Sequence, residues 1–367
     1  MFRAEQGERP DPLSARRIGV LTFHRSFNYG SYWQARCLVE GLAAPGLRVE
    51  LLDHESADVR RAEARCLMQP ALPERSNPAD FPNYKAKARR FAEAFAALPM
   101  SRSFPLDAPA SAGRYDAVVV GSDEVWNFEH PWYGGKPIFF GEGLEAGRLV
   151  SYAASFGNHD AVDGVDHWWS GRLDAFDAVS VRDANSQRIV AEALGREPPL
   201  VLDPCLQFSH VIPRAPADAE APYLLVYGHG FPAWLQAALH RWSRRTGVRL
   251  LSVGYRNAWA DAHMIAAGPL EFARLMAGAA AIATNFFHGC VFALVNTKPL
   301  VVVPTSYRFN KIRDLAAALA FPHRIVGEDT PQRQLDALLD TPPEPHVDER
   351  LAALRRQSAH YLSAALA

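Results

Sequence analysis

Asp116-Ala117-Val118-Val119-Val120, followed by Gly121-Ser122-Asp123, is the stretch from which the fold class follows most directly. A continuous apolar run of this kind is typical of a parallel strand that is buried on both faces of a sheet. The glycine and the polar residues after it predict a turn at the carboxyl end of the strand. Similar short strands are expected in the same half of the chain at residues 17–23, 48–53, 149–154, 178–181 and 200–202, with helices at 31–42, 84–97 and 185–194.

The alternation restarts after a proline-rich stretch. Residues 213–222 contain Pro213, Pro216 and Pro222, a density that is typical of a linker. Alternating strands and helices on both sides of a linker predict an α/β protein with two parallel, helix-covered sheets. In the second half, strands are expected at 223–227, 249–253, 279–284 and 300–303, and helices at 232–246, 269–276, 288–296, 310–319 and 349–365.

The pattern predicts two Rossmann-like domains that face each other. We expect a flexible tail over residues 1–15, a first domain over 16–212, a linker over 213–222, a second domain over 223–345 and a C-terminal helix over 346–367 that crosses back to the first domain. Ligands of open parallel sheets bind at the carboxyl ends of the strands, so the cleft between the two domains is the expected site.

Charge and cysteine content exclude several classes of protein. The 39 Lys and Arg residues nearly balance 40 Asp and Glu residues, which gives a net charge of −1. A protein that binds duplex nucleic acid by neutralising phosphates usually carries a basic excess, so nucleic acid is not an expected partner. The four cysteines include no C-x-x-C pair, and the histidines show no metal-ligand spacing, so no metal site is expected.

The expected location is the cytoplasm. The low density of cysteines suits a reducing compartment. The polar N-terminal residues lack the apolar stretch of a secretory signal, and no run approaches the ~20 apolar residues of a membrane helix. We therefore expect a soluble protein without a membrane span, and the sequence leaves the oligomeric state open.

The turn after the first strand, residues 24–31, suits an anion. Ser31 is expected to cap the helix that follows, and the N-terminus of that helix attracts negative charge. Arg25 adds a guanidinium whose shape matches carboxylate or phosphate. The alternative is an ordinary strand-to-helix turn, and the dinucleotide fingerprint G-x-G-x-x-G is absent.

Two further turns carry charged side chains. Ser122 and Asp123 either cap the next turn or place an acid where it can accept a proton from a hydroxyl group. Arg182 lies at the end of the strand expected at 178–181, where it either faces the cleft or forms a salt bridge with Asp183 or a more distant acid.

The fourth turn, residues 283–290, ends in a histidine at the start of a helix. The helix dipole disfavours the charged form of His288, whereas a bound phosphate favours it, so this imidazole suits a general acid or base. The alternative is a structural histidine. Cys290 is expected to be a small buried side chain, and His229 is the other histidine expected near the cleft.

Taken together, these turns resemble the polysaccharide pyruvyl transferase family over about residues 18–326. Each motif alone is weak, but the ordered set is specific. The motifs are Thr22-Phe23-His24, Asn28-Tyr29-Gly30 with Gln34, Gly121-Ser122-Asp123-Glu124-Val125-Trp126-Asn127, Ser151-Tyr152-Ala153-Ala154-Ser155-Phe156-Gly157, Ser180-Val181-Arg182-Asp183, Asp203-Pro204, Gly268-Pro269 with Glu271-Phe272, Phe287-His288-Gly289, and Asn310-Lys311-Ile312-Arg313.

The resemblance implies a glycosyltransferase type B-like architecture and the transfer of a pyruvyl group from phosphoenolpyruvate to a sugar or lipid-linked glycan precursor, as in exopolysaccharide biosynthesis. Phosphoenolpyruvate is then a co-substrate, and no cofactor is needed. We assign His288 as the acid or phosphate partner and Asp123 as the candidate base. The donor contacts would be Arg25, Asn28, Tyr29, Gly30, Ser31, Arg182, Asn285, Gly289 and Lys311, and the acceptor side would hold Ser122, Trp126 and His229.

One position departs from the family pattern. Many members read Thr-Asp-Ser-Phe-His-Gly, whereas here Asn285 and Phe286 replace the acid and the serine. A carboxylate at residue 285 would be able to orient His288, which an amide cannot do by charge. Two alternatives therefore stay open: a glycosyltransferase that uses a nucleotide-sugar donor, and a non-catalytic family member that binds a ligand or a partner.

Overall fold

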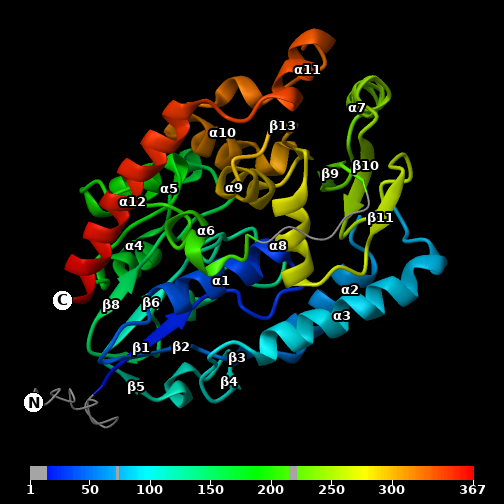
Figure 1. Ribbon diagram of the computed structural model, residues 1–367. Helices are drawn as coiled ribbons and strands as arrows, with labels where there is room; N and C mark the ends of the chain where they lie inside the picture. The colour runs from blue at the N-terminus through cyan, green and yellow to red at the C-terminus, as the bar shows by residue number, and fades with distance from the viewer. Residues whose placement is uncertain (1–14, 72–73, 215–220) are drawn as a thin grey trace, which may run out of the picture.

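The computed structural model describes residues 15–71, 74–214 and 221–367. The expected tail, except for residue 15, and most of the expected linker lie outside these ranges. The described chain contains two parallel sheets of four and five strands, together with two two-stranded pairs (Figure 1). The α/β class with two parallel sheets is thus confirmed.

The first sheet has the strand order β2-β1-β6-β8. Its strands are β1 (Arg16–Leu21), β2 (Leu47–Leu51), β6 (Ala117–Val120) and β8 (Leu149–Ser151), and the two pairs are β3 (His54–Glu55) with β4 (Phe104–Pro105) and β5 (Arg114–Tyr115) with β7 (Glu145–Ala146). The helices of this half are α1 (Tyr29–Gly41), α2 (Ala57–Met68), α3 (Phe81–Ala96), α4 (His167–Asp174), α5 (Ala184–Leu194) and α6 (Pro204–Gln207).

The second sheet has the order β11-β10-β9-β12-β13. Its strands are β9 (Tyr223–Tyr227), β10 (Arg249–Val253), β11 (Ala262–Met264), β12 (Ala281–Thr284) and β13 (Leu300–Val302). The helices are α7 (Ala233–Thr246), α8 (Pro269–Gly278), α9 (Phe287–Val295), α10 (Phe309–Ala318), α11 (Gln332–Asp340) and α12 (Pro345–Leu366). The 3₁₀ turns are η1 (Pro78–Asp80), η2 (Pro109–Ala112), η3 (Pro137–Phe140), η4 (Ala161–Asp163), η5 (Ser209–Val211), η6 (Ser306–Arg308) and η7 (Pro322–Arg324).

The long helix α12 returns to the first half of the chain and runs beside its green segments in Figure 1. Tyr361 donates a hydrogen bond from its hydroxyl to the backbone oxygen of Ser151 at 2.7 Å. The hydroxyl of Ser358 accepts the backbone N–H of Leu202 at 2.9 Å. The last helix therefore packs against the first half of the chain beside β8, at the edge of the first sheet.

Some expected elements differ from those observed. Residues 178–181 and 200–202 are not strands, because they meet the sheet only through single bridges such as Val150 to Ala178 and Val181 to Leu200. Their apolar residues are buried as expected, but each stretch is too short to pair along its length. Four further elements, α2, α4, β11 and α11, were not predicted. In α2, α4 and β11 the apolar residues are few, whereas α11 does carry a helical spacing of buried leucines at 335, 338 and 339.

The two halves share one core. Tyr29 at the start of α1 stacks on Phe272 of α8 with ring centroids 4.3 Å apart, and its hydroxyl donates to the backbone oxygen of Ala267 at 2.7 Å. Trp33 of the same helix donates to the backbone oxygen of Pro269 at 3.0 Å. These contacts hold the first turn of α1 against the second half.

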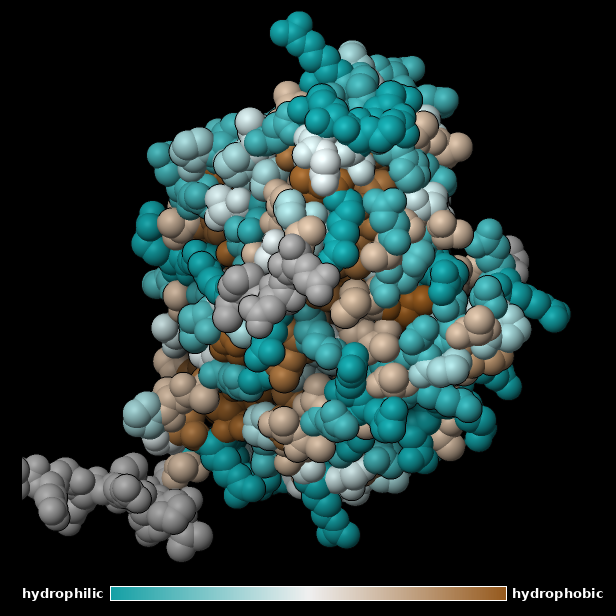
Figure 2. All heavy atoms as spheres, turned by 45° about the vertical axis from the view of Figure 1, so that its right-hand side comes forward, coloured by the Kyte–Doolittle hydropathy of each residue, from teal (hydrophilic) through white to brown (hydrophobic). Residues whose placement is uncertain are grey.

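On the face shown in Figure 2, hydrophilic side chains make up most of the outermost surface, and apolar atoms lie mainly in the recesses between them. None of the helices in the described ranges is both long enough and apolar enough to span a membrane.

Candidate functional site

A cavity of about 270 Å³ opens where the two halves meet. Its walls include turns that follow the carboxyl ends of strands, which is where open parallel sheets bind ligands, and residues of the helices next to them. From the first half these include residues 26–28, 123–124 and 130–133, and from the second half 227, 229, 286–288, 308 and 311. We refer to this cavity as the central pocket.

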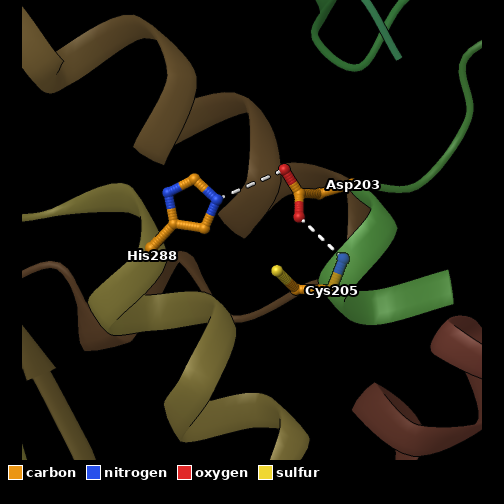
Figure 3. Close-up of side chains that lie close together, drawn as sticks. All are labelled: Asp203, Cys205 and His288. Atoms are coloured by element: carbon orange, nitrogen blue, oxygen red, sulfur yellow. Dashed lines mark hydrogen bonds and ion pairs between the residues drawn. The ribbon is translucent and has the colours of Figure 1, made fainter. Parts of the chain in front are cut away.

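His288 is the second residue of α9, and its side chain lines the central pocket. Its ring lies so close to the backbone of α1 that a Cβ placed on Gly30 would come 2.1 Å from Nδ1. Glycine at residue 30 is therefore what makes room for the imidazole. On its other side, Nε2 lies 3.5 Å from Oδ2 of Asp203 (Figure 3), an ion contact longer than a good hydrogen bond.

Asp203 precedes α6 and caps it by accepting the backbone N–H of Cys205 at 3.0 Å. Its other oxygen accepts a hydrogen bond from Nη1 of Arg182 at 3.0 Å. Burial opposes ionisation of this carboxyl group, but His288 and Arg182 more than offset it and lower the pKa of Asp203 to about 2. The carboxylate beside His288 is thus charged at neutral pH.

Arg182 is a buried cation that joins two carboxylates. Besides Asp203 it contacts Asp123, with Nη2 3.2 Å from Oδ1, and its guanidinium lies over the ring of Phe287 at 4.7 Å. Burial alone would lower the pKa of Arg182, but Asp123 and Asp203 raise it above its usual value. Arg182 is among the residues that line the central pocket, and it also forms salt bridges with two acids that are distant in sequence.

Asp123 uses both carboxylate oxygens. Oδ1 accepts from Arg182 and from the backbone N–H of Glu124 at 3.0 Å, and Oδ2 accepts from the hydroxyl of Ser31 at 2.8 Å. Ser31 therefore does not cap α1 as expected. Asn28 is the cap, because its Oδ1 accepts the backbone N–H groups of Gly30 at 2.8 Å and of Ser31 at 3.3 Å.

Glu124 and Lys311 form an ion pair across the seam between the two halves. Burial opposes ionisation of Glu124, but the positive charges of Lys311 and Arg182 lower its pKa to about 2. The turn after β6 is thereby tied to α10 at the wall of the central pocket.

Seven of the predicted site residues line the central pocket: Asn28, Ser31, Asp123, Arg182, His229, His288 and Lys311. Seven others are not among its lining residues: Arg25, Tyr29, Gly30, Ser122, Trp126, Asn285 and Gly289. Gly30 acts through its contact with His288, and Tyr29 belongs to the shared core.

The other five residues outside the pocket lining, Asn285 among them, make contacts elsewhere in the protein. Arg25 forms a fork with both oxygens of Asp53 at 2.6 Å. Ser122 donates to Gln34, and Trp126 donates to the backbone oxygen of Phe139. Gly289 packs on Thr284, where a Cβ would come 2.1 Å from the hydroxyl oxygen.

The side chain of Asn285 hydrogen-bonds to the loop after β9, and the structure shows no hydrogen bond between Asn285 and His288 in the described residues. Its side-chain nitrogen donates to the backbone oxygen of His229 at 2.7 Å, and its buried Oδ1 has no hydrogen-bond partner in the described structure. The acid beside His288 is instead Asp203, from the other half of the chain. His229 is neutral at pH 7, because burial and the charge of Arg308 lower its pKa to about 4.

Several residues in or next to the central pocket had no clear sequence signal. Asp203 belongs to a family motif that does not indicate its position beside His288, and the places of Lys87, Glu63, His130 and Arg308 in the pocket wall depend on tertiary contacts. Burial lowers the pKa of His130, and its Nδ1 accepts the backbone N–H of Tyr133 at 3.2 Å, which leaves Nε2 as the protonated nitrogen of the neutral ring.

Asp203, Cys205 and His288 place possible metal-ligand atoms within 4.8 Å of one another (Figure 3). The environment does not suit a metal ion. Arg182 already brings a positive charge to Asp203, and burial raises the pKa of the Cys205 thiol well above its usual value, which keeps the sulfur protonated. The group is better described as an imidazole and an arginine-paired carboxylate beside a buried thiol.

Solved structures of other proteins align with this chain at low sequence identity and with TM-scores below 0.5. No curated protein matches the chain. Among solved structures, the chain aligns with the glycosyltransferase SnogD of Streptomyces nogalater at 14% identity and a TM-score of 0.45, covering 96% of this chain and 100% of that one. It also aligns with MnaA of S. aureus, solved with UDP, at 10% identity and a TM-score of 0.48. That alignment covers 89% of this chain and 90% of that one.

A mutant O-GlcNAc transferase of Thermobaculum terrenum aligns at 12% identity and a TM-score of 0.39. The alignment covers 97% of this chain, but the chain spans only 65% of that protein.

At the sequence level, the family described as polysaccharide pyruvyl transferase matches residues 28–307. This match includes the whole second sheet, strands β2, β6 and β8 of the first sheet, and the pocket residues from Asn28 to His288. The chain is therefore a transferase that belongs to the polysaccharide pyruvyl transferase family.

Proposed function

We propose that the protein transfers the pyruvyl group of phosphoenolpyruvate to two hydroxyl groups of a sugar or glycan precursor, forming a ketal. In this reaction the methylene carbon of the donor gains a proton and becomes a methyl group. The neighbouring carbon forms bonds to two sugar oxygens, each of which loses its proton, and its bond to the phosphate oxygen breaks. The products are the ketal and inorganic phosphate.

The observation that carries the proposal is that His288, which lines the central pocket, lies beside the carboxylate of Asp203. An imidazole suits the transfer of a proton to the methylene carbon, and the carboxylate of Asp203 lies where it can orient the ring. Many family members carry an acid at residue 285, whereas here the carboxylate beside His288 comes from a different segment, at Asp203.

Asp123 and Ser31 suit the acceptor hydroxyl. The Ser31 hydroxyl lines the central pocket and already donates to Asp123. In our proposal Ser31 accepts the proton of the sugar hydroxyl while it passes its own to Asp123. Arg182 also binds Asp123 and holds the carboxylate next to Ser31, and the step depends on the electrophilic carbon that protonation of the donor creates.

The donor class is tested by thermal shift. A ligand present at 100 times its dissociation constant stabilises a protein by about 2.7 kcal/mol, so phosphoenolpyruvate should raise the unfolding temperature and UDP-glucose and GDP-mannose should not. Stabilisation by a nucleotide sugar alone would favour a glycosyltransferase.

Transfer itself is tested by phosphate release from phosphoenolpyruvate with a panel of mono- and oligosaccharides, run in D₂O. Pyruvyl transfer predicts one deuterium in the product methyl group. Donor binding without phosphate release by any acceptor would favour a non-catalytic member of the family.

A further inference from the structure

Lys87 of α3 is a buried lysine in the wall of the central pocket. Its side chain lies between aromatic rings, with Nζ 4.7 Å from the ring centroid of Tyr29 and 5.2 Å from that of Tyr255. It makes one hydrogen bond, to the backbone oxygen of Gly254 at 3.3 Å. The residue is only 3% exposed, and it is one of the residues that line the central pocket.

The charge of Lys87 is not balanced by the protein. Among the described residues, no carboxylate forms an ion pair with Lys87. An ammonium group has three N–H donors, and among the described residues only the backbone oxygen of Gly254 accepts a hydrogen bond from it. By contrast, Arg182 pairs with Asp123 and Asp203, and Lys311 pairs with Glu124. Because it lacks such a partner, burial lowers the pKa of Lys87 to about 7.

Buried charges in proteins are normally paired. A lysine that lines a cavity without a protein counter-ion is thus suited to a counter-ion that arrives with the ligand. We propose that Lys87 is a substrate-binding residue that pairs with an oxyanion, carboxylate or phosphate, of the ligand in the central pocket. In naming phosphoenolpyruvate as the source of that oxyanion, the inference rests on the proposed function.

This pairing predicts proton uptake on binding. An oxyanion next to Lys87 favours the ammonium form, so above pH 7 the amine gains a proton as the ligand binds. Titratable groups close to it include Tyr29 of α1 and Tyr255 after β10, and Cys66 and Glu63 of α2 line the same pocket, as do His130, His229 and His288. Burial raises the pKa of Cys66, Glu63 and Tyr29, and of Tyr255 as well, so these groups hold their protons more firmly.

The first test measures phosphoenolpyruvate binding by calorimetry at pH 8 in buffers of different ionisation enthalpy. Lys87→Met keeps an unbranched side chain of similar size, and Lys85→Met on the exposed side of the same helix is the matched control. We expect Lys87→Met to weaken binding by about 10- to 100-fold, as for loss of a charged hydrogen bond, and to reduce proton uptake. Unchanged affinity and unchanged uptake would overturn the proposal.

The second test uses the unmodified protein, so it does not depend on the folding of a variant. A lysine with a pKa near 7 reacts faster with acetic anhydride at pH 8 than ordinary lysines do. We expect the ligand to protect Lys87, and not Lys85, from acetylation, as measured by mass spectrometry. Lack of protection by phosphoenolpyruvate, phosphate and pyruvate alike would overturn the proposal.

The ligands separate the two claims. Protection by phosphate but not pyruvate places the phosphate at Lys87, and the reverse places the carboxylate there. If phosphoenolpyruvate does not bind but phosphate protects Lys87, the donor of the proposed function is wrong and the anion site stands. If phosphoenolpyruvate binds without protecting Lys87, the donor stands and the role of Lys87 is wrong.

Discussion

The imidazole of His288 lies against the backbone of Gly30, so close that a single added carbon would come 2.1 Å from Nδ1. The two residues belong to different halves of the chain and to the first turns of two helices, α1 and α9. The contact fixes one side of the ring, and Asp203 approaches the other side. The position of the proposed acid therefore depends on how the two halves meet.

Gly30→Ala tests this contact. The added methyl group must displace the imidazole or move the start of α1, and a small misplacement of a reacting group can lower the rate by about 10²-fold. We expect turnover, measured by phosphate release, to fall while the protein stays folded. Gly171→Ala is the control, since nothing lies within 4 Å of the Cβ it adds. Equal turnover in both variants would contradict the account.

His288→Gln keeps a polar side chain but cannot transfer a proton as an acid. If His288 protonates the donor, turnover should fall by about 10²–10⁴-fold. The measurement is the initial rate of phosphate release at saturating donor. The exposed His323, which pairs with Glu344, provides the control His323→Gln. A fully active His288→Gln variant would end the assignment.

Arg182→Lys removes the fork that joins Asp123 to Asp203. A lysine is a single point charge and cannot hold both acids in the same geometry. We expect weaker donor binding and a lower turnover, measured by calorimetry and by phosphate release. Donor affinity equal to that of the unmodified protein would count against a role for the guanidinium at the site.

Asn285→Asp introduces the acid that many family members carry. In this structure the new carboxylate would face the backbone oxygen of His229, which now accepts a hydrogen bond from the amide. Loss of that bond in a buried place should cost about 1–3 kcal/mol, seen as a lower unfolding temperature without a gain in turnover. A marked rise in turnover would show that residue 285 acts on His288 after all.

Acid should destabilise the seam of the protein. The pKa values of Glu124 and Asp203 fall from 4.5 and 3.8 to about 2 in the folded state, so their contribution is present above about pH 4.5 and is lost as the pH falls towards 2. Each pKa unit corresponds to about 1.4 kcal/mol.

The check is the unfolding temperature between pH 3 and pH 7. Glu124→Gln should be less stable than the unmodified protein at pH 7 and should lose less stability on acidification. The exposed Glu328→Gln is the control, and its profile should follow that of the unmodified protein. An equally steep acid transition in Glu124→Gln would contradict the assignment of its pKa.

Much of the fold could be predicted because strands such as β6 (AVVV) and β9 (YLLVY) are continuous apolar runs. The strand at 223–227 was predicted with the observed bounds, since every residue of β9 is buried. The expected strand at 178–181 failed because its pairing is limited to single bridges. Local hydrophobicity reports burial, but whether a buried segment pairs along its length is decided by its neighbours.

The site was harder to predict, because its charges are paired through tertiary contacts. His288 and Arg182 could be proposed from their places at the ends of expected strands. That Asp203 sits beside both, and that Arg25 is held by Asp53 away from the central pocket, depends on segments distant in sequence. Lys87 gave no signal, because a lysine on a mixed-charge helix is normally exposed.

The most direct test is a calorimetric titration of the protein with phosphoenolpyruvate and, separately, with UDP-glucose. The account predicts saturable binding of phosphoenolpyruvate at one site, with binding weakened in Arg182→Lys and in Lys87→Met. Binding of UDP-glucose alone, or phosphoenolpyruvate affinity that neither substitution changes, would contradict the claim that the central pocket holds this donor.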